Sequence, residues 1–232
     1  LREAMVSGLM DGICRLGGDE LPLSQVRISV AVERREKIEN AIGSWYFSAH
    51  DFSDDELLHA AMLMLQHALA MPQLEQWRLS AGKFHFFGSD VLAHAVSRLP
   101  SANIRSENLT GFLVACRAAY NAFVPYHNFR HVIDVLQAVF HFLVHLDTLP
   151  PFPAGSASSS PQKSPIAALL RPFDALTLLI TAIGHDVGHP GVNNAFLVTL
   201  NAPLAQLYND RSVLESFHCA AYSQILRRYW PS

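Results

Sequence analysis

Residues 128–146 read NFRHVIDVLQAVFHFLVHL, a stretch in which apolar side chains recur every three or four positions. This spacing puts the apolar side chains on one face of an α-helix, so the stretch predicts an amphipathic helix packed against a core. Helical periodicity dominates elsewhere too, and no segment alternates with period two for long enough to indicate a sheet. The fold class is therefore expected to be all-α. The predicted helices cover residues 32–49, 54–71, 88–98, 107–123, 128–146, 172–186, 192–200 and 212–229.

Three of these helices are preceded by residue types that cap helix starts. Ser53 comes before an acidic first turn, Ser106 precedes Glu107, and either Asp210 or Ser212 precedes the last helix. Their side-chain oxygens are expected to accept hydrogen bonds from first-turn amides.

Composition excludes several classes of protein. With 232 residues, of which 50% are hydrophobic, the chain can bury a sizeable core. A formal charge of −3 offers no basic surface for nucleic acid, so no nucleic-acid partner is expected. The most apolar stretches, residues 57–71 and 175–183, are too short to span a bilayer, so no integral membrane segment is expected.

The cysteines and the first residues bear on location. Cys14, Cys116 and Cys219 are far apart, odd in number and embedded in apolar helical patterns, which is typical of buried free thiols in a reducing compartment. The chain starts Leu1-Arg2-Glu3 without a secretion signal or an initiator methionine. We expect a cytoplasmic segment of a longer protein.

Residues 150–165, PPFPAGSASSSPQKSP, interrupt the helical pattern. Proline, serine and glycine at this density predict a surface loop. A softer boundary near Pro72 divides the chain into a helical extension of unknown role, residues 1–72, and a second region, residues 73–232, that contains the loop as an insertion.

Two short motifs carry the chemistry: YHNFRH at residues 126–131 and HDVGHPG at residues 185–191. Each has two histidines four residues apart, and the second adds a carboxylate directly after its first histidine. Imidazole nitrogens and carboxylate oxygens in such groups are typical of metal sites. On a helix His127 and His131 would share one face, about 6 Å apart along the axis, so one could bind a metal while the other faces a substrate.

His185 and Asp186 end a strongly apolar helix. An unpaired buried carboxylate is very costly, and a dication would supply the missing partner. A His-Asp pair that caps the helix without a metal is the alternative interpretation. Gly188 permits a left-handed turn that ends the helix, and Pro190 prevents its continuation.

Seven other histidines are expected to have no role in this site. His145 lies 18 residues after His127, which is about 27 Å along a helix axis, so it cannot join the same cluster. Histidines at the edge of a core are common. The same interpretation applies to His50, His59, His67, His85, His94 and His141.

Three motifs resemble those of the class I cyclic nucleotide phosphodiesterases, within the HD superfamily. YHNFRHVIDV (126–135) resembles YHN-x-x-H-x-x-DV, HDVGHPGVNN (185–194) resembles HD-x-x-HPG-x-x-N, and YNDRSVLE (208–215) resembles YND-x-SVLE. The similarity covers about residues 77–230, and the loop insertion is similar to that of fungal members. The resemblance implies a compact multi-helix catalytic bundle, of which residues 73–232 would be the N-terminal part.

The resemblance also implies a two-metal site. His131, His185 and Asp186 match three protein ligands of a zinc ion, and Asp186 matches the carboxylate that bridges to magnesium or manganese. The fourth zinc ligand and a purine-binding glutamine are expected beyond Ser232, so we expect little activity from residues 1–232 alone. Position 188 departs from the pattern, because many animal members have aspartate where Gly188 stands.

The remaining matched positions surround the metals. His127 matches the general acid that protonates the leaving 3′ oxygen, and Glu215 matches the carboxylate that orients this histidine. His189 matches a contact to metal-bound water. Asn194, rather than the adjacent asparagine, matches the family asparagine, and Tyr126 matches a tyrosine that lines the pocket.

The chemistry of a cyclic phosphodiester agrees with this set of residues. Its hydrolysis needs a hydroxide at neutral pH, neutralisation of phosphoryl charge, and a proton for the leaving alkoxide. We therefore expect hydrolysis of 3′,5′-cyclic nucleotides, cAMP more than cGMP, to 5′-monophosphates. Two alternatives stay open. Another HD-superfamily phosphohydrolase would not be expected to have the YHN and SVLE motifs, and a non-catalytic regulatory or nucleotide-binding fragment would leave His127 and Glu215 unexplained. Regulatory partners cannot be read from these motifs.

Overall fold

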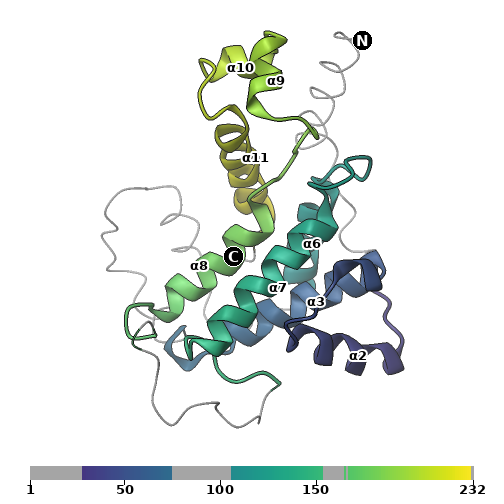
Figure 1. Ribbon diagram of the computed structural model, residues 1–232. Coiled ribbons are helices and arrows are strands. Elements are labelled where there is room, and N and C mark those ends of the chain that lie inside the picture. Colours follow the sequence, from purple (N-terminus) through teal and green to yellow (C-terminus); the bar gives the residue numbers. More distant parts are fainter. Residues whose placement is uncertain (1–27, 75–105, 154–164, 166, 231–232) are drawn as a thin grey trace.

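The computed structural model describes residues 28–74, 106–153, 165 and 167–230, and within these residues it contains helices and no strand (Figure 1). The all-α prediction is confirmed. The predicted helix at 88–98, together with Cys14, His85 and His94, lies outside the described residues. The helices are α2 (Val32–Ile42), the short 3-10 helix η2 (Ala49–Asp51), α3 (Asp54–Leu69), α6 (Ser106–Ala118), α7 (Phe129–His145), α8 (Pro172–Gly184), α9 (Asn194–Thr199), α10 (Pro203–Leu207) and α11 (Val213–Tyr229).

The helix starts agree with the sequence patterns at α3 but not at α11. Ser53 and Glu56 form a reciprocal capping box at the start of α3, with the Ser53 amide 2.8 Å from the Glu56 carboxylate. Ser212 precedes α11 with a left-handed backbone and no side-chain cap, so the prediction of a serine or aspartate cap there is wrong. The helix α2 is also shorter than predicted, since it ends at Ile42 and the chain turns after Gly43.

The core lies between α3, α6, α7 and α8. The apolar stripe of α7 faces inward, and Ile133, Leu136 and Phe140 are almost completely buried. Helix α2 packs on α3, α11 packs on α6 and α8, and α9 and α10 lie together at one end of the molecule (Figure 1). Since α2 and α3 contribute to the same core, the described part of the N-terminal extension is joined to the helices that carry the two motifs.

Three smaller predictions have mixed outcomes. Cys116 is buried as expected, but Cys219 is exposed, because it lies on the outer side of α11. The first residues of the predicted loop are packed: the Phe152 ring lies 5.2 Å from both the Phe140 and His67 rings. Within the described residues, no helix is both long and apolar enough to cross a membrane.

Gly184, at the end of α8, allows a close contact between α8 and α11. A Cβ atom at this position would lie 2.2 Å from the Tyr222 ring, which is buried and fixed by a 2.7 Å hydrogen bond from its hydroxyl to the Ile180 carbonyl. Alanine is favoured over glycine in a helix by about 1 kcal/mol, but such an overlap forces the two helices apart.

We predict that Gly184→Ala lowers the free energy of unfolding by about 1–3 kcal/mol, measured by urea denaturation. Gly43→Ala is the control, because a Cβ there would meet its nearest atoms at 3.7 Å. The loss should shrink when Tyr222 is also replaced by leucine. Equal stability of the two single variants would contradict the steric explanation.

The ion pair between Arg34 of α2 and Glu56 of α3 makes stability depend on pH. The hydrogen bond from Arg34 lowers the pKa of Glu56 to about 2, more than its burial raises it. A carboxyl with a lowered pKa stabilises the fold above its unfolded pKa of about 4.3, and this contribution is lost as the pH falls towards 2.

We predict that Glu56→Gln destabilises the protein above pH ~5 and that the difference from wild type disappears near pH ~2. The measurement is urea denaturation across this range. Glu36→Gln, on the exposed side of α2, controls for loss of a surface charge. A difference that persists unchanged at low pH would argue against the ion pair as its cause.

Candidate metal centre

The two motifs meet where the first turn of α7 lies beside the end of α8. His131 lies in the first turn of α7, and His185 and Asp186 directly follow α8. Buried Tyr120 fixes the end of α8: its hydroxyl donates to the Ile183 carbonyl at 2.8 Å and accepts the Asp186 amide at 3.3 Å. The turn that follows is therefore held by a side chain from the segment after α6.

Gly188 lets the chain reverse after Asp186. Its φ of +74° is in the left-handed region, as the sequence predicts, and its amide donates to the Ala119 carbonyl at 3.0 Å. The space that a Cβ would occupy is filled by the Phe217 ring, 2.7 Å away. This contact places the start of α11 against the turn.

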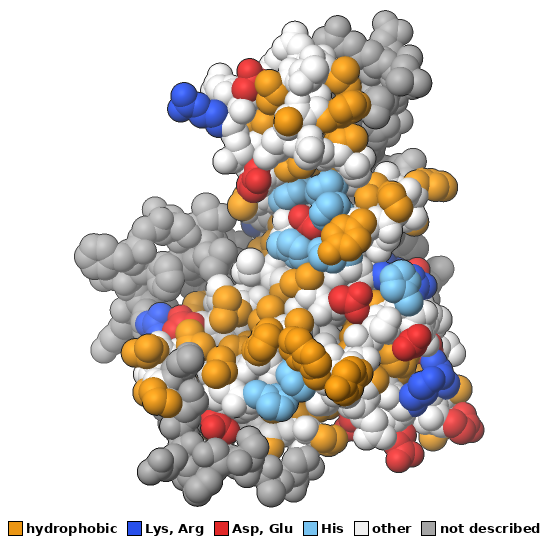
Figure 2. All heavy atoms as spheres, in the orientation of Figure 1, with side chains coloured by type: hydrophobic (Ala, Val, Ile, Leu, Met, Phe, Trp, Pro, Cys, Tyr) orange, Lys and Arg blue, Asp and Glu red, His pale blue; other side chains and the backbone are white. Residues whose placement is uncertain are grey.

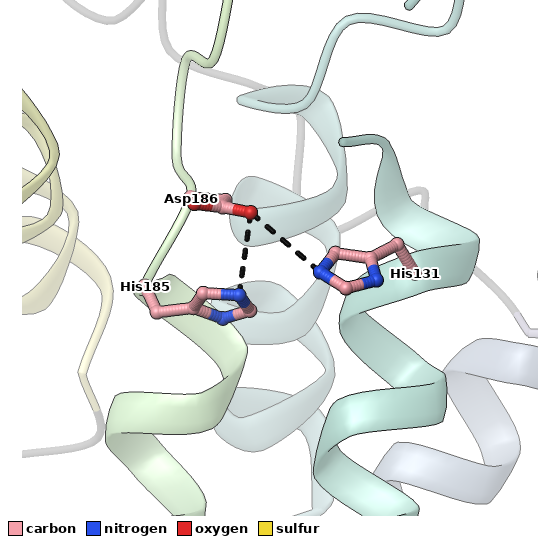
Figure 3. Close-up of side chains that lie close together, drawn as sticks. All are labelled: His131, His185 and Asp186. Carbon is pink, nitrogen blue, oxygen red and sulfur yellow. Dashed lines mark ion pairs between the residues drawn. The ribbon is translucent and has the colours of Figure 1, made fainter. Parts of the chain in front are cut away.

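Three side chains converge on one point (Figure 3). Asp186 Oδ2 lies 3.3 Å from His185 Nε2 and 3.7 Å from His131 Nε2. Ligand atoms that share a tetrahedral zinc ion are about 3.3–3.6 Å apart, because each lies about 2.0–2.2 Å from the metal. The spacing of these atoms therefore fits a single metal ion with little rearrangement.

The hydrogen bonds of the rings leave the correct nitrogens free for a metal. His185 Nδ1 donates to the Ala182 carbonyl at 2.8 Å, so in the neutral ring Nε2 carries the lone pair. His218 Nδ1 similarly donates to the Val187 carbonyl at 2.8 Å, and its Nε2 lies 3.8 Å from Asp186 Oδ1. Both rings present a ligand nitrogen to the carboxylate.

The electrostatics also favour a cation. Burial raises the pKa of Asp186, but the hydrogen bond and charge of His185, with the charges of His218 and His189, outweigh it and bring the pKa to about 2. Burial and the charge of His185 lower the pKa of His131. The hydrogen bond with Asp186 raises the pKa of His185. A divalent metal requires an ionised carboxylate and neutral imidazoles, so at His185 it would compete with the proton that the hydrogen bond with Asp186 favours.

A second potential metal-binding group shares Asp186 and adds His189 and His218. His218 is 5% exposed and was not predicted from the sequence, although it lies three residues after Glu215 and so on the same side of a helix. His189 differs from the other rings, because its Nδ1 accepts the Gly191 amide at 3.0 Å. Neutral His189 therefore carries its proton on Nε2 and can act as a donor.

His127 and Tyr126 border this cluster. The His127 ring stacks on His189, with centroids 3.9 Å apart, and lies 5.7 Å from the His131 ring. Tyr126 is 62% exposed and its ring is 4.6 Å from that of His131. Figure 2 shows histidine side chains around an acidic side chain on one face of the molecule, bordered by hydrophobic ones.

Glu215 and Asn194 form a pair at the start of α11. Asn194 Nδ2 donates to both carboxylate oxygens of Glu215, at 3.0 and 3.3 Å, and its Oδ1 accepts the Leu214 amide at 2.9 Å. Asn194 thus supplies the cap that α11 lacks from its own preceding residue. Within the described residues, Glu215 forms no hydrogen bond with His127, whose contacts are with other rings.

The histidines that were expected to have no role lie elsewhere. His141 and His145 stack on each other at 3.9 Å in the last turns of α7, beside Trp45. His67 Nε2 donates to the Pro150 carbonyl at 2.9 Å. None of these rings belongs to either metal-binding group within the described residues.

Comparison with known proteins identifies the same region. Residues 126–230 match the family "3′5′-cyclic nucleotide phosphodiesterase". The 3′,5′-cyclic-nucleotide phosphodiesterase 2 of Saccharomyces cerevisiae is 34% identical over 128 residues, which are 55% of this chain and 20% of the relative. The human high affinity cAMP-specific and IBMX-insensitive 3′,5′-cyclic phosphodiesterase 8A is 38% identical over 117 residues, 50% of this chain and 12% of the relative.

The fold agrees with these matches. The crystal structure of yeast caPDE2 superposes with a TM-score of 0.66 and 32% identity, over 98% of this chain and 40% of that one. The chain thus spans a minor part of the proteins it matches. The three motifs lie within or beside the matched residues 126–230, so this region of the chain is similar in sequence and in fold to 3′,5′-cyclic nucleotide phosphodiesterases.

Proposed function

We propose that the protein containing this chain hydrolyses 3′,5′-cyclic nucleotides to 5′-nucleoside monophosphates at a two-metal site formed by His131, His185 and Asp186. The observation that carries this proposal is the convergence of these side chains on one point beside His127. We infer that residues 73–232 are the N-terminal part of a catalytic domain in a cytoplasmic, fungal-type member, with residues 1–72 as its extension.

His131, His185 and Asp186 would hold zinc, and Asp186 would also contact a second ion, magnesium or manganese, held otherwise mostly through water. Bound there, the metals would neutralise charge on the phosphate and activate a water molecule for attack. Asp186 would supply the negative charge that both cations share. His131 and His185 complete the first position, with the Ala182 carbonyl fixing the tautomer of His185.

The remaining residues handle protons and orientation. His127 donates a proton to the departing 3′ oxygen, which would otherwise leave as an alkoxide. His189 presents an Nε2 donor to water at the metals, since its Nδ1 is already an acceptor for the Gly191 amide. Glu215, held by Asn194, would orient His127. Tyr126 lines the pocket.

The substrate is proposed to be cAMP rather than cGMP. The similarity to a human enzyme named as cAMP-specific supports this preference. Competition between the two nucleotides in a turnover assay of the full-length protein is the direct test.

We predict that Asp186→Ala in the full-length protein removes both metals, because this carboxylate is shared by the two positions. Elemental analysis after gel filtration measures the loss. Asp174→Ala is the control, since Asp174 binds Arg171 at the start of α8, far along the helix from the site. Undiminished metal in the Asp186 variant would show that the cluster does not hold them.

We predict that His127→Asn lowers kcat by about 10²–10⁴-fold while both metals stay bound. The loss should be smallest for an activated aryl phosphodiester, whose leaving group needs no proton. His145→Asn, on the same helix but outside the cluster, should leave kcat unchanged. Equal losses for the cyclic nucleotide and the aryl ester would assign His127 a structural role instead.

A further inference from the structure

Arg130, in the first turn of α7, binds the backbone of a distant segment. Its Nη1 donates to the carbonyls of Ala49 and Phe52, at 2.8 and 2.6 Å, and its Nη2 donates to Asp54 Oδ1 at 3.1 Å. The guanidinium therefore joins both ends of the η2 turn to the first residue of α3. Its planar arrangement of donors suits this contact, because a single side chain can bind several acceptors in fixed directions.

Two further polar side chains of α7 bind the same segment, one and two turns later. Asp134 Oδ1 accepts the Ala49 amide at 2.7 Å. Gln137, which is 4% exposed, donates from Nε2 to the carbonyls of Ile42 and Ser44, at 2.8 and 2.9 Å. We call residues 42–54 the brace. It is irregular apart from η2, and side chains of α7 satisfy its backbone groups.

The brace adds directional contacts to the apolar packing at the start of α7. Hydrophobic contacts between helices are not directional, whereas hydrogen bonds to fixed carbonyls define the position of a side chain along and around the helix. Asn128 caps α7 by accepting the Arg130 amide at 3.0 Å and donating to the Val124 carbonyl at 2.9 Å. Arg130 thus connects this cap to the brace through its own backbone and side chain.

We propose that Arg130 is a positioning residue, which uses the brace to hold His131 and His127 at the correct distance from Asp186. His131 is the next residue along α7, and His127 directly precedes the cap. The inference rests on the proposed function and gives the described part of the N-terminal extension a role in it. A displacement of about 1 Å in a reacting group can reduce turnover by up to about 10²-fold.

The test is Arg130→Met in the full-length protein, which keeps an apolar stem and removes every donor. We expect kcat for cAMP to fall about tenfold with a smaller change in KM, and zinc affinity, measured by chelator competition, to fall as well. Amide hydrogen exchange of residues 129–133 should become faster, a readout that needs neither metal nor substrate.

Arg34→Met is the matched control. Arg34 binds Glu56 and the Asp51 carbonyl in the same region, but among the described residues it has no hydrogen bond with α7. Arg34→Met should lower the melting temperature without changing kcat, zinc affinity or amide hydrogen exchange in α7. Asp134→Asn should behave like wild type because it keeps the acceptor for the Ala49 amide, whereas Asp134→Leu should resemble Arg130→Met.

Two results would overturn the positioning role. One is an Arg130→Met protein whose kcat, zinc affinity and α7 exchange match those of Arg34→Met. The other is an Arg130→Met protein that loses only global stability and whose kcat equals that of wild type at lower temperature. A wild-type protein that turns over no cyclic nucleotide would instead defeat the proposed function, and exchange and zinc affinity would still test the inference.

Discussion

The ionised carboxylate of Asp186 lies half-buried where the start of α7, the end of α8 and the middle of α11 come together. A carboxylate in such surroundings is costly unless it is paired, and imidazoles from three helices surround this one. Hydrogen bonds from neighbouring residues hold those imidazoles in position. Tyr120 fixes the end of α8, backbone carbonyls fix the tautomers of His185 and His218, and Asn128 fixes the first turn of α7.

The part of this arrangement that could be predicted from the sequence is the part that depends on local patterns. Apolar periodicity is enough to predict α3, α7, α8 and α11 to within two residues. The adjacency of His185 and Asp186 is enough to predict that this pair could face a metal. The prediction that His127 and His131 share one face of a helix is wrong, because His127 precedes the N-cap Asn128, although the two rings still lie 5.7 Å apart. That the two pairs meet follows only from the packing of α7 against α8.

Other features depend on contacts between distant parts of the chain and could not be predicted. Asn194, twenty residues before Leu214 in the sequence, caps α11, so the predicted cap directly before Val213 is wrong. His218 enters the cluster only because α11 packs over the turn that follows Asp186. The bonds from α7 to the brace join residues 76 to 95 positions apart, and no local pattern signals contacts of this range.

The close approach of Gly188 and Phe217 joins the second motif to α11, two residues after the end of the third motif. Aspartate tolerates the left-handed backbone at position 188 at moderate cost. It can stand there only if the Phe217 ring no longer fills the space that its Cβ needs. These two positions are therefore expected to covary among related chains: aspartate at the first should accompany a smaller side chain at the second. Aspartate at position 188 alone would overlap the Phe217 ring, and a smaller side chain at position 217 alone would leave a cavity, so the two positions could be exchanged only as a unit.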